Sequence, residues 1–171
     1  MPPELLIDPC QLDLNRVLAD RKEIERVNPQ RFEMEQLTAI VYMDTSQHLI
    51  IGYKDVTADE FWVRGHMPEY PIMPGVVMCE AAAQLCSYYS MANGMLLGDF
   101  LGFGGMDNVR FRGPVRPGDR FVLISKGIKI RRRQCVYNVQ GLVGSTMVFH
   151  ADIIGVSLVR QAGEPVLAEE S

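Results

Sequence analysis

The sequence has no apolar run approaching the roughly 20 residues that a membrane-spanning helix needs. Its first residues, Met1 to Glu4, carry neither the basic nor the apolar region of a secretory signal. The four cysteines show no CxxC or Cys/His spacing of a metal site, and they are too few for a disulfide framework in 171 residues. We therefore expect a cytoplasmic protein without a bound metal, in which the cysteines are small buried apolar residues: Cys10, Cys79, Cys86 and Cys135.

Charge is distributed unevenly along the chain. The net charge is -4, but residues 110–133 contain nine basic residues and one acidic residue, so this segment carries +8 and the remainder -12. A local basic field in an acidic protein indicates attraction for an anionic partner, and it argues against general nucleic-acid binding, for which the whole domain is usually basic. The alternative is an exposed, solvated sheet face.

The first half of the chain alternates between helical and strand patterns. Prolines predict an extended arm over 1–11, and apolar residues at helical spacing predict an amphipathic helix over 12–27. Two strands are expected at 37–43 and 48–54, around a polar turn. Residues 64–75 contain three prolines and two glycines and are predicted to form a loop.

The second half is predicted to be one buried helix followed by strands. Residues 74–92 are apolar nearly all round, which is typical of a buried helix, and a glycine-rich link is expected at 97–105. Alternating apolar residues predict four strands, at 106–112, 119–130, 134–143 and 146–158. Strands on both sides of one long helix indicate an α+β fold with an antiparallel sheet wrapped on that helix. We divide the chain into an N-terminal arm and helix (1–27), a single domain (28–159) and a polar tail (160–171).

The segment that carries chemistry runs from Gly65 to Gln84. His66 lies in a stiff loop, and the free amides and positive dipole end of a helix follow at Gly75. Glu80 falls among apolar residues inside that helix, so its carboxyl group must be paired, protonated or directed into a cavity. Gln84, four residues further on the same face, could hydrogen-bond it. Each residue taken alone also has a purely structural interpretation.

The whole segment resembles the signature of the β-hydroxyacyl-acyl-carrier-protein dehydratases of fatty acid synthesis, the FabZ type. That signature reads G-H-F-P-x-x-P-x-M-P-G-V-x-x-x-E-A-x-A-Q. The chain matches it at Gly65, His66, Pro68, Pro71, Met73, Pro74, Gly75, Val76, Glu80, Ala81, Ala83 and Gln84. The run from Asp107 to Asp119 is similar to the family's D-x-x-x-F-R-x-P-V-x-P-G-D. The resemblance spans roughly residues 24–158, and glutamate at position 80 favours the FabZ type over the related dehydratase/isomerase type, which carries aspartate.

The chain departs from the family pattern mainly before the signature. The stretch from Pro29 to Ala39 lacks the histidine, second proline and aspartate of the family's P-H-R-Y/F-P-F-L-L-V-D-R. Met67 stands where phenylalanine is usual, and Glu69 and Tyr70 replace a small glycine-containing pair. The candidate catalytic pair is intact, so these changes leave open the choice of acyl chain and the pathway.

The resemblance implies a hot-dog fold, a curved antiparallel sheet around a long central helix. It also implies a dimer, in larger assemblies a trimer of dimers, with the active-site histidine from one chain and the glutamate from the other. The implied reaction is dehydration of a (3R)-3-hydroxyacyl thioester to the trans-2-enoyl thioester. The substrate is carried on the phosphopantetheine arm of acyl carrier protein or on coenzyme A, and no metal or redox cofactor is required.

The residues suit the steps of that reaction. His66 could remove the α-proton, because histidine titrates near neutrality. Amides at the helix start, Gly75 above all, could stabilise charge on the thioester oxygen, with Gln84 positioning the substrate. Glu80 could protonate the leaving hydroxyl group, or the two residues could exchange roles.

The basic segment suits an acidic carrier protein, and its candidate contacts are Arg110, Arg112, Arg131, Arg132 and Arg133. Methionines could line an acyl pocket, or simply fill the core. Two other functions remain open. One is another hot-dog enzyme, a thioesterase or an enoyl-CoA hydratase. The other is a non-catalytic protein that binds acyl carriers or acyl thioesters.

Overall fold

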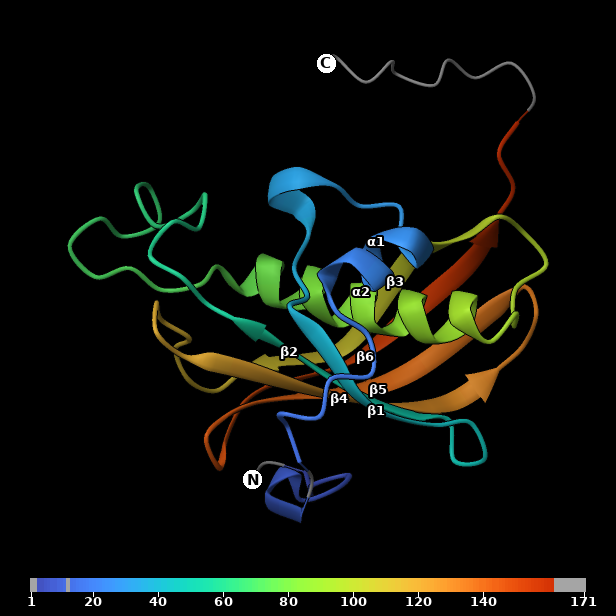
Figure 1. Cartoon of the computed structure of the whole chain (residues 1–171), viewed down its shortest axis with the longest axis horizontal. Coiled ribbons are helices and arrows are strands. Elements are labelled where there is room, and N and C mark those ends of the chain that lie inside the picture. Colours follow the sequence, from blue (N-terminus) through green and yellow to red (C-terminus); the bar gives the residue numbers. More distant parts are fainter. Residues whose placement is uncertain (1–2, 12, 162–171) are drawn as a thin grey trace.

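An antiparallel sheet forms the frame of the structure, a computed structural model that describes residues 3–11 and 13–161 (Figure 1). Within these residues six strands pair in the order β1-β2-β4-β5-β6-β3. The strands are β1 (Ala39–Asp44), β2 (Leu49–Asp55), β3 (Phe100–Phe111), β4 (Arg120–Ile130), β5 (Gln134–Val143) and β6 (Thr146–Leu158). Every neighbouring pair is antiparallel.

The long helix α2 (Gly75–Ala92) lies along one face of this sheet and contacts β2, β3, β4 and β6 (Figure 1). Its apolar residues are buried on nearly every side, and Leu85 and Tyr89 are fully enclosed. Removing this apolar surface from water is the main source of stability for the fold. The α+β class and the sheet wrapped on a central helix are confirmed.

The predicted helix over 12–27 is wrong in its first half. Helix α1 spans only Arg21–Val27, where Asp20 accepts the backbone N–H of Glu23 and the Glu23 carboxylate accepts that of Asp20. This capping box starts the helix at residue 21. The apolar residues before it do not continue one helical stripe. Leu14 packs on the outer face of the sheet, the face turned away from α2, whereas Ile24 belongs to the core between the sheet and α2.

The residues before α1 therefore cover a second apolar layer on the outer face. Leu6, Ile7 and Leu14 pack against side chains of β1, β2, β4 and β5. The buried Gln140 holds this segment, because its amide donates to the Glu4 carbonyl and accepts the Leu6 N–H. The short 3-10 turn η1 (Pro9–Gln11) lies in the same arm. Of the predicted tail, residues 162–171 lie outside the described residues.

The predicted link over 97–105 is also partly wrong, because β3 begins at Phe100 and runs through it. Glycine is required in this strand by close packing. A Cβ atom on Gly104 would lie 2.8 Å from Val156 Cγ1 on the neighbouring β6. β3 is an edge strand of the sheet, and Phe103, Met106 and Phe111 on it are exposed.

No helix that the structure describes is both long and apolar enough to cross a membrane. Three cysteines are buried as expected, whereas Cys10 is exposed in the N-terminal arm, so the expectation fails for that residue. Burial raises the pKa of the Cys86 thiol to about 12 and also raises that of Cys79, which leaves little reactive thiolate at neutral pH.

We therefore expect a thiol reagent such as Ellman's reagent to modify one cysteine rapidly in the native protein and all four after denaturation. The fast phase should disappear in Cys10→Ser. It should also accelerate at higher pH, because the hydrogen bond and charge of Asp8 raise the pKa of Cys10. Rapid reaction of a second thiol in native Cys10→Ser would contradict the buried positions of the other three.

Candidate active site

The loop between β2 and α2 holds His66 in one orientation. Trp62 is buried, and its carbonyl accepts the backbone N–H groups of Gly65 and His66 at 3.2 and 2.7 Å. The ring atom Nδ1 of His66 lies 2.7 Å from the carbonyl oxygen of Ile72. Because a carbonyl only accepts, Nδ1 carries the hydrogen and donates it, so the neutral ring presents Nε2 as a base.

The first turn of α2 lies beside this histidine. Pro74 is the N-cap and its carbonyl accepts the N–H groups of Val77 and Met78. The N–H groups of Gly75 and Val76 come before the first helical hydrogen bond and have no acceptor within the helix. His66, Gly75, Phe111 and Arg112 line one open cleft of about 750 Å³. The structure thus places a base and a pair of helix amides, a candidate oxyanion site, around one space.

Glu80 lies further along α2, and Gln84 determines its orientation. The Gln84 Nε2 donates to Glu80 Oε1 at 2.7 Å, as the spacing of four residues predicts. The same Nε2 donates to the carbonyl of Met34, and Gln84 Oε1 accepts the backbone N–H of Gln36 at 2.8 Å. These two backbone partners leave only one possible orientation for the amide. Gln84 therefore contacts Glu80 and is not among the residues that line the His66 cleft.

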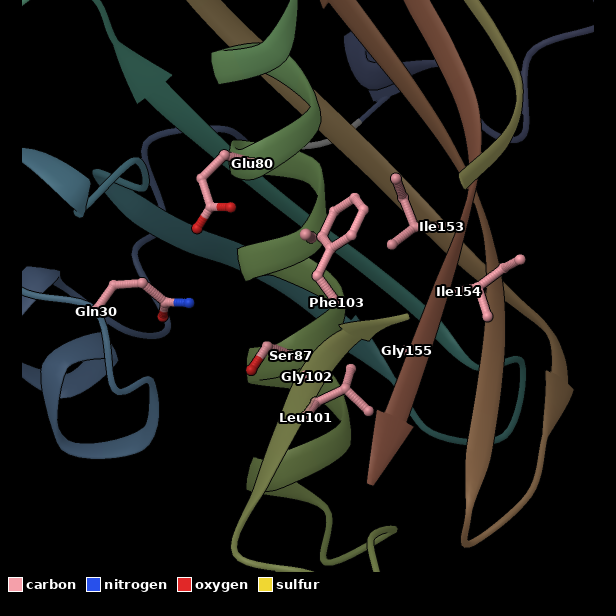
Figure 2. A pocket seen from close by; sticks show the side chains of 10 residues that line it. Gln30, Glu80, Ser87, Leu101, Gly102, Phe103, Ile153, Ile154 and Gly155 are labelled. Carbon is pink, nitrogen blue, oxygen red and sulfur yellow. The ribbon is translucent and has the colours of Figure 1, made fainter. Parts of the chain in front are cut away.

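A second, smaller cavity lies beside Glu80, between α2 and the strands β3 and β6. Its volume is about 40 Å³, and Figure 2 shows the side chains around it. One side is polar and the other is formed mostly by apolar residues and glycine. The lining residues are Gln30, Glu80, Ala83, Ser87, Leu101, Gly102, Phe103, Ile153, Ile154 and Gly155. No methionine lies among them, whereas Met73 and Met78 line the His66 cleft.

The two candidate catalytic side chains do not meet within one chain. His66 lines the cleft and Glu80 lines the cavity, and no hydrogen bond joins them among the described residues. Strand β3 borders both spaces at different points along its length. Phe103 lines the Glu80 cavity, and Phe111 lines the His66 cleft. Both spaces therefore lie along the exposed edge of the sheet.

The basic segment does not form one patch. Arg112 lines the His66 cleft at the start of α2, where its Nε donates to His150 Nδ1 at 3.3 Å. Arg110 lies two residues earlier on β3. The turn that carries Arg131, Arg132 and Arg133 packs at the opposite end of α2, because the carbonyl of Arg132 accepts the N–H of Leu97. The two groups therefore lie near opposite ends of α2, a helix of 18 residues that is roughly 27 Å long.

Sequence reasoning did not assign several lining residues to these spaces, among them Gln30, Ser87 and Phe111. Ser87 could have been found, because it is a polar residue seven positions after Glu80 on the same face of an apolar helix. Gln30 belongs to the stretch that departs from the family pattern, but nothing local shows that it faces Glu80. Among the described residues, no group of three or more His, Cys, Asp or Glu side chains is placed to hold a metal ion.

Comparison with known proteins identifies the family. A FabA-like domain model matches residues 28–152. The chain is 35% identical over 152 residues to a 3-hydroxyacyl-acyl-carrier-protein dehydratase FabZ of Allorhizobium ampelinum, covering 89% of this chain and 97% of that one. It is also 35% identical over 114 residues to the same enzyme of Streptococcus agalactiae, covering 67% and 80% of the two chains. The chain therefore belongs to the FabA-like family.

Solved structures with low sequence identity share its fold. The dehydratase heterocomplex ApeI:P of Xenorhabdus doucetiae superposes with a TM-score of 0.66 at 12% identity, covering 79% of this chain and 90% of the other. The PaaI protein of the E. coli phenylacetic acid degradation operon gives 0.55 at 16% identity, covering 68% and 80%. The expected hot-dog fold is confirmed.

The packing of Gly75 yields a prediction about the cleft. A Cβ atom on Gly75 would lie 2.7 Å from Cζ of Phe111, so Gly75→Ala must displace that ring. Phe111 is half exposed, so we expect little loss of thermal stability. We expect kcat/KM for hydration of a trans-2-enoyl thioester to fall by about tenfold or more, because displaced groups misalign the substrate.

The double variant Gly75→Ala/Phe111→Leu is the matched control, because leucine removes the ring that the new methyl group meets. Recovery of activity in the double variant would support the steric cause. Unchanged activity in Gly75→Ala alone would contradict it.

Proposed function

We propose that this protein dehydrates (3R)-3-hydroxyacyl thioesters on acyl carrier protein to trans-2-enoyl thioesters, in the biosynthesis of fatty acids or related lipids. The observation that carries the proposal is the arrangement of His66 and Glu80 in a FabA-like domain. Each side chain is held through one atom by the protein, His66 through Nδ1 and Glu80 through Oε1. The opposite atom of each, Nε2 and Oε2, is left for the substrate.

The reaction needs a base, an oxyanion site and an acid. Nε2 of His66 takes the proton from C2, and the electron pair moves toward the thioester carbonyl. The amides of Gly75 and Val76 stabilise the negative charge on that oxygen, assisted by the helix dipole. The pair then forms the C2–C3 double bond while the C3–O bond breaks. Glu80, in the role of the acid, gives a proton to the departing hydroxide, so one enoyl thioester and one water leave. Side chains and backbone amides of the protein are sufficient for each step. That the reaction requires no cofactor remains a prediction.

A homodimer completes this site. β3 is an edge strand with apolar side chains exposed along its length, and an uncovered edge of this kind is a template for pairing with another strand. Pairing of two copies through β3 would bring the His66 cleft of one chain toward the Glu80 cavity of the other, since both spaces lie along that strand. A further assembly into a trimer of dimers is compatible with this arrangement.

The acyl carrier protein would approach the mouth of the His66 cleft. Arg112 lines that mouth, and Arg110 extends the positive charge along β3. The cluster Arg131 to Arg133 lies at the far end of α2 in the same chain and is a weaker candidate for this contact. An acidic carrier and the phosphate of its pantetheine arm match the guanidinium groups. A cytoplasmic location stays a prediction.

Glu80→Gln tests the acid role. Glutamine keeps the shape of the side chain and can still accept the hydrogen bond from Gln84, but it cannot donate an acidic proton. We expect turnover to fall by about a hundredfold or more, with the melting temperature close to that of the wild type. The assay follows the loss of enoyl absorbance during hydration of trans-2-butenoyl thioesters. Glu4→Gln, an equal change of charge at an exposed position, is the control.

Near-wild-type turnover in Glu80→Gln would refute the acid role. Binding of acyl carrier protein without turnover by the wild-type protein would favour a non-catalytic carrier-binding function. Release of free thiol from the thioester would favour a thioesterase.

A mixed dimer tests whether the site is shared between chains. His66→Ala and Glu80→Gln are each expected to be inactive alone. If each site takes its histidine from one chain and its glutamate from the other, a mixed dimer contains one intact site and one doubly altered site. Random mixing of the two variants should then restore about one quarter of wild-type activity. The mixed dimers are made by unfolding and refolding the two variants together or by co-expressing them, and activity should rise only after this exchange of chains. No recovery, with mixed dimers demonstrated by two affinity tags, would place both residues of a site in one chain.

A further inference from the structure

The cavity beside Glu80 has a polar side that the proposed reaction does not use. Gln30 Oε1 is buried and has no hydrogen-bond partner among the residues that the structure describes. Ser87 is also buried, and its hydroxyl contacts only the thioether sulfur of Met91, at 3.6 Å, which is a weak acceptor. Both residues line the cavity, and Figure 2 shows their side chains directed toward the space between them.

Leaving a buried polar group without a partner costs about 1–3 kcal/mol. An acyl pocket for a plain hydrocarbon chain gains nothing from such groups, since alkyl carbons offer no hydrogen bond. The apolar residues Leu101, Phe103 and Ile153 on the other side suit a chain of methylene groups. The combination of one polar and one apolar wall therefore fits a chain that is mostly hydrocarbon and carries a small polar group.

The size and position of the cavity specify that group further. A volume of about 40 Å³ is that of a few water molecules, so an acyl chain enters this cavity only if its apolar wall moves outward, and the polar group that meets Gln30 and Ser87 must be small. The amide of Gln30 and the hydroxyl of Ser87 each offer a donor and an acceptor, which matches the two functions of an alcohol. Ser87 follows Glu80 by seven residues, roughly 10 Å along the helix. The alcohol would therefore lie several carbons beyond C3.

We infer that Gln30 and Ser87 are specificity residues that select acyl chains bearing a hydroxyl group toward their distal end. This inference rests on the proposed dehydratase function, because it places C3 of the substrate at Glu80. Gln30 accepts from or donates to the alcohol on one side, and Ser87 does so on the other. A site built to hydrogen-bond a substrate hydroxyl discriminates strongly against the analogue that lacks it, because its own polar groups are then left unpaired.

The test compares matched pairs of substrates. Each pair consists of a trans-2-enoyl thioester of acyl carrier protein and its counterpart with a terminal hydroxyl, in hexenoyl, octenoyl and decenoyl lengths. We expect the hydroxylated member to have a kcat/KM higher by about tenfold or more at the length that reaches Gln30 and Ser87. The ratio of kcat/KM between the hydroxylated and the plain substrate should be near one when the chain is too short or too long for its hydroxyl group to contact Gln30 and Ser87. Hydration of the unsubstituted butenoyl thioester is the separate test of the dehydratase function.

Variants of Gln30 and Ser87 test whether these two residues cause the preference for hydroxylated chains. Gln30→Leu and Ser87→Ala should each reduce the ratio within a pair several-fold, and the double variant should reverse it by favouring the plain chain. Gln47→Leu, a matched change in the exposed turn between β1 and β2, should keep the wild-type ratio. Binding of each pair to Glu80→Gln, measured by calorimetry, gives the same comparison without turnover.

The outcomes separate the two claims. Turnover of butenoyl thioester with ratios near one at every length would overturn the hydroxyl selection and retain the dehydratase. A wild-type preference that persists in the double variant would overturn the assignment to Gln30 and Ser87. Absence of all turnover would overturn the dehydratase, and the calorimetric ratio would still decide whether the cavity selects an alcohol.

Discussion

The buried amide of Gln84 is the contact on which the Glu80 half of the site depends. It joins α2 to the segment before β1, because it donates to the Met34 carbonyl and accepts from the Gln36 amide. Its remaining hydrogen bond orients Glu80. One side chain therefore fixes both the carboxyl group and the segment over residues 34–36, a few residues after Gln30. Replacing it with an apolar residue would leave several buried polar groups unpaired at once, each at a cost of about 1–3 kcal/mol.

The fold could be predicted from the sequence where local pattern and tertiary environment agree. The helix over 74–92 and the last three strands were found almost to the residue, because each is a long, mostly apolar segment with a loop or turn on both sides. The helix over 12–27 was overextended, because periodicity counts apolar residues without showing which surface each one covers. Leu14 and Ile24 belong to opposite faces of the sheet. The glycines before Met106 suggested a link, although they are there to let β3 approach β6.

The candidate site was predictable only as far as contiguous motif residues define it. His66, Gly75, Glu80 and Gln84 follow from one segment, and the structure adds the tautomer of the histidine and the orientation of the glutamate. Gln30 could not be found in this way, since fifty residues separate it from Glu80 and only the folded chain brings the two to one cavity. The arginines at the two ends of the basic segment lie near opposite ends of α2, because strand β4 runs across the sheet between them.

The edge strand β3 links the chemistry to assembly. It contributes Phe103 to the Glu80 cavity and Phe111 to the His66 cleft, and it exposes apolar side chains together with unpaired backbone groups. A lone chain would thus carry two incomplete half-sites and an edge prone to aggregation. One pairing event through this edge would cover the apolar residues, satisfy the backbone groups and bring a base opposite an acid. In the proposed dimer, activity and protection from aggregation would therefore depend on the same twelve residues of the strand.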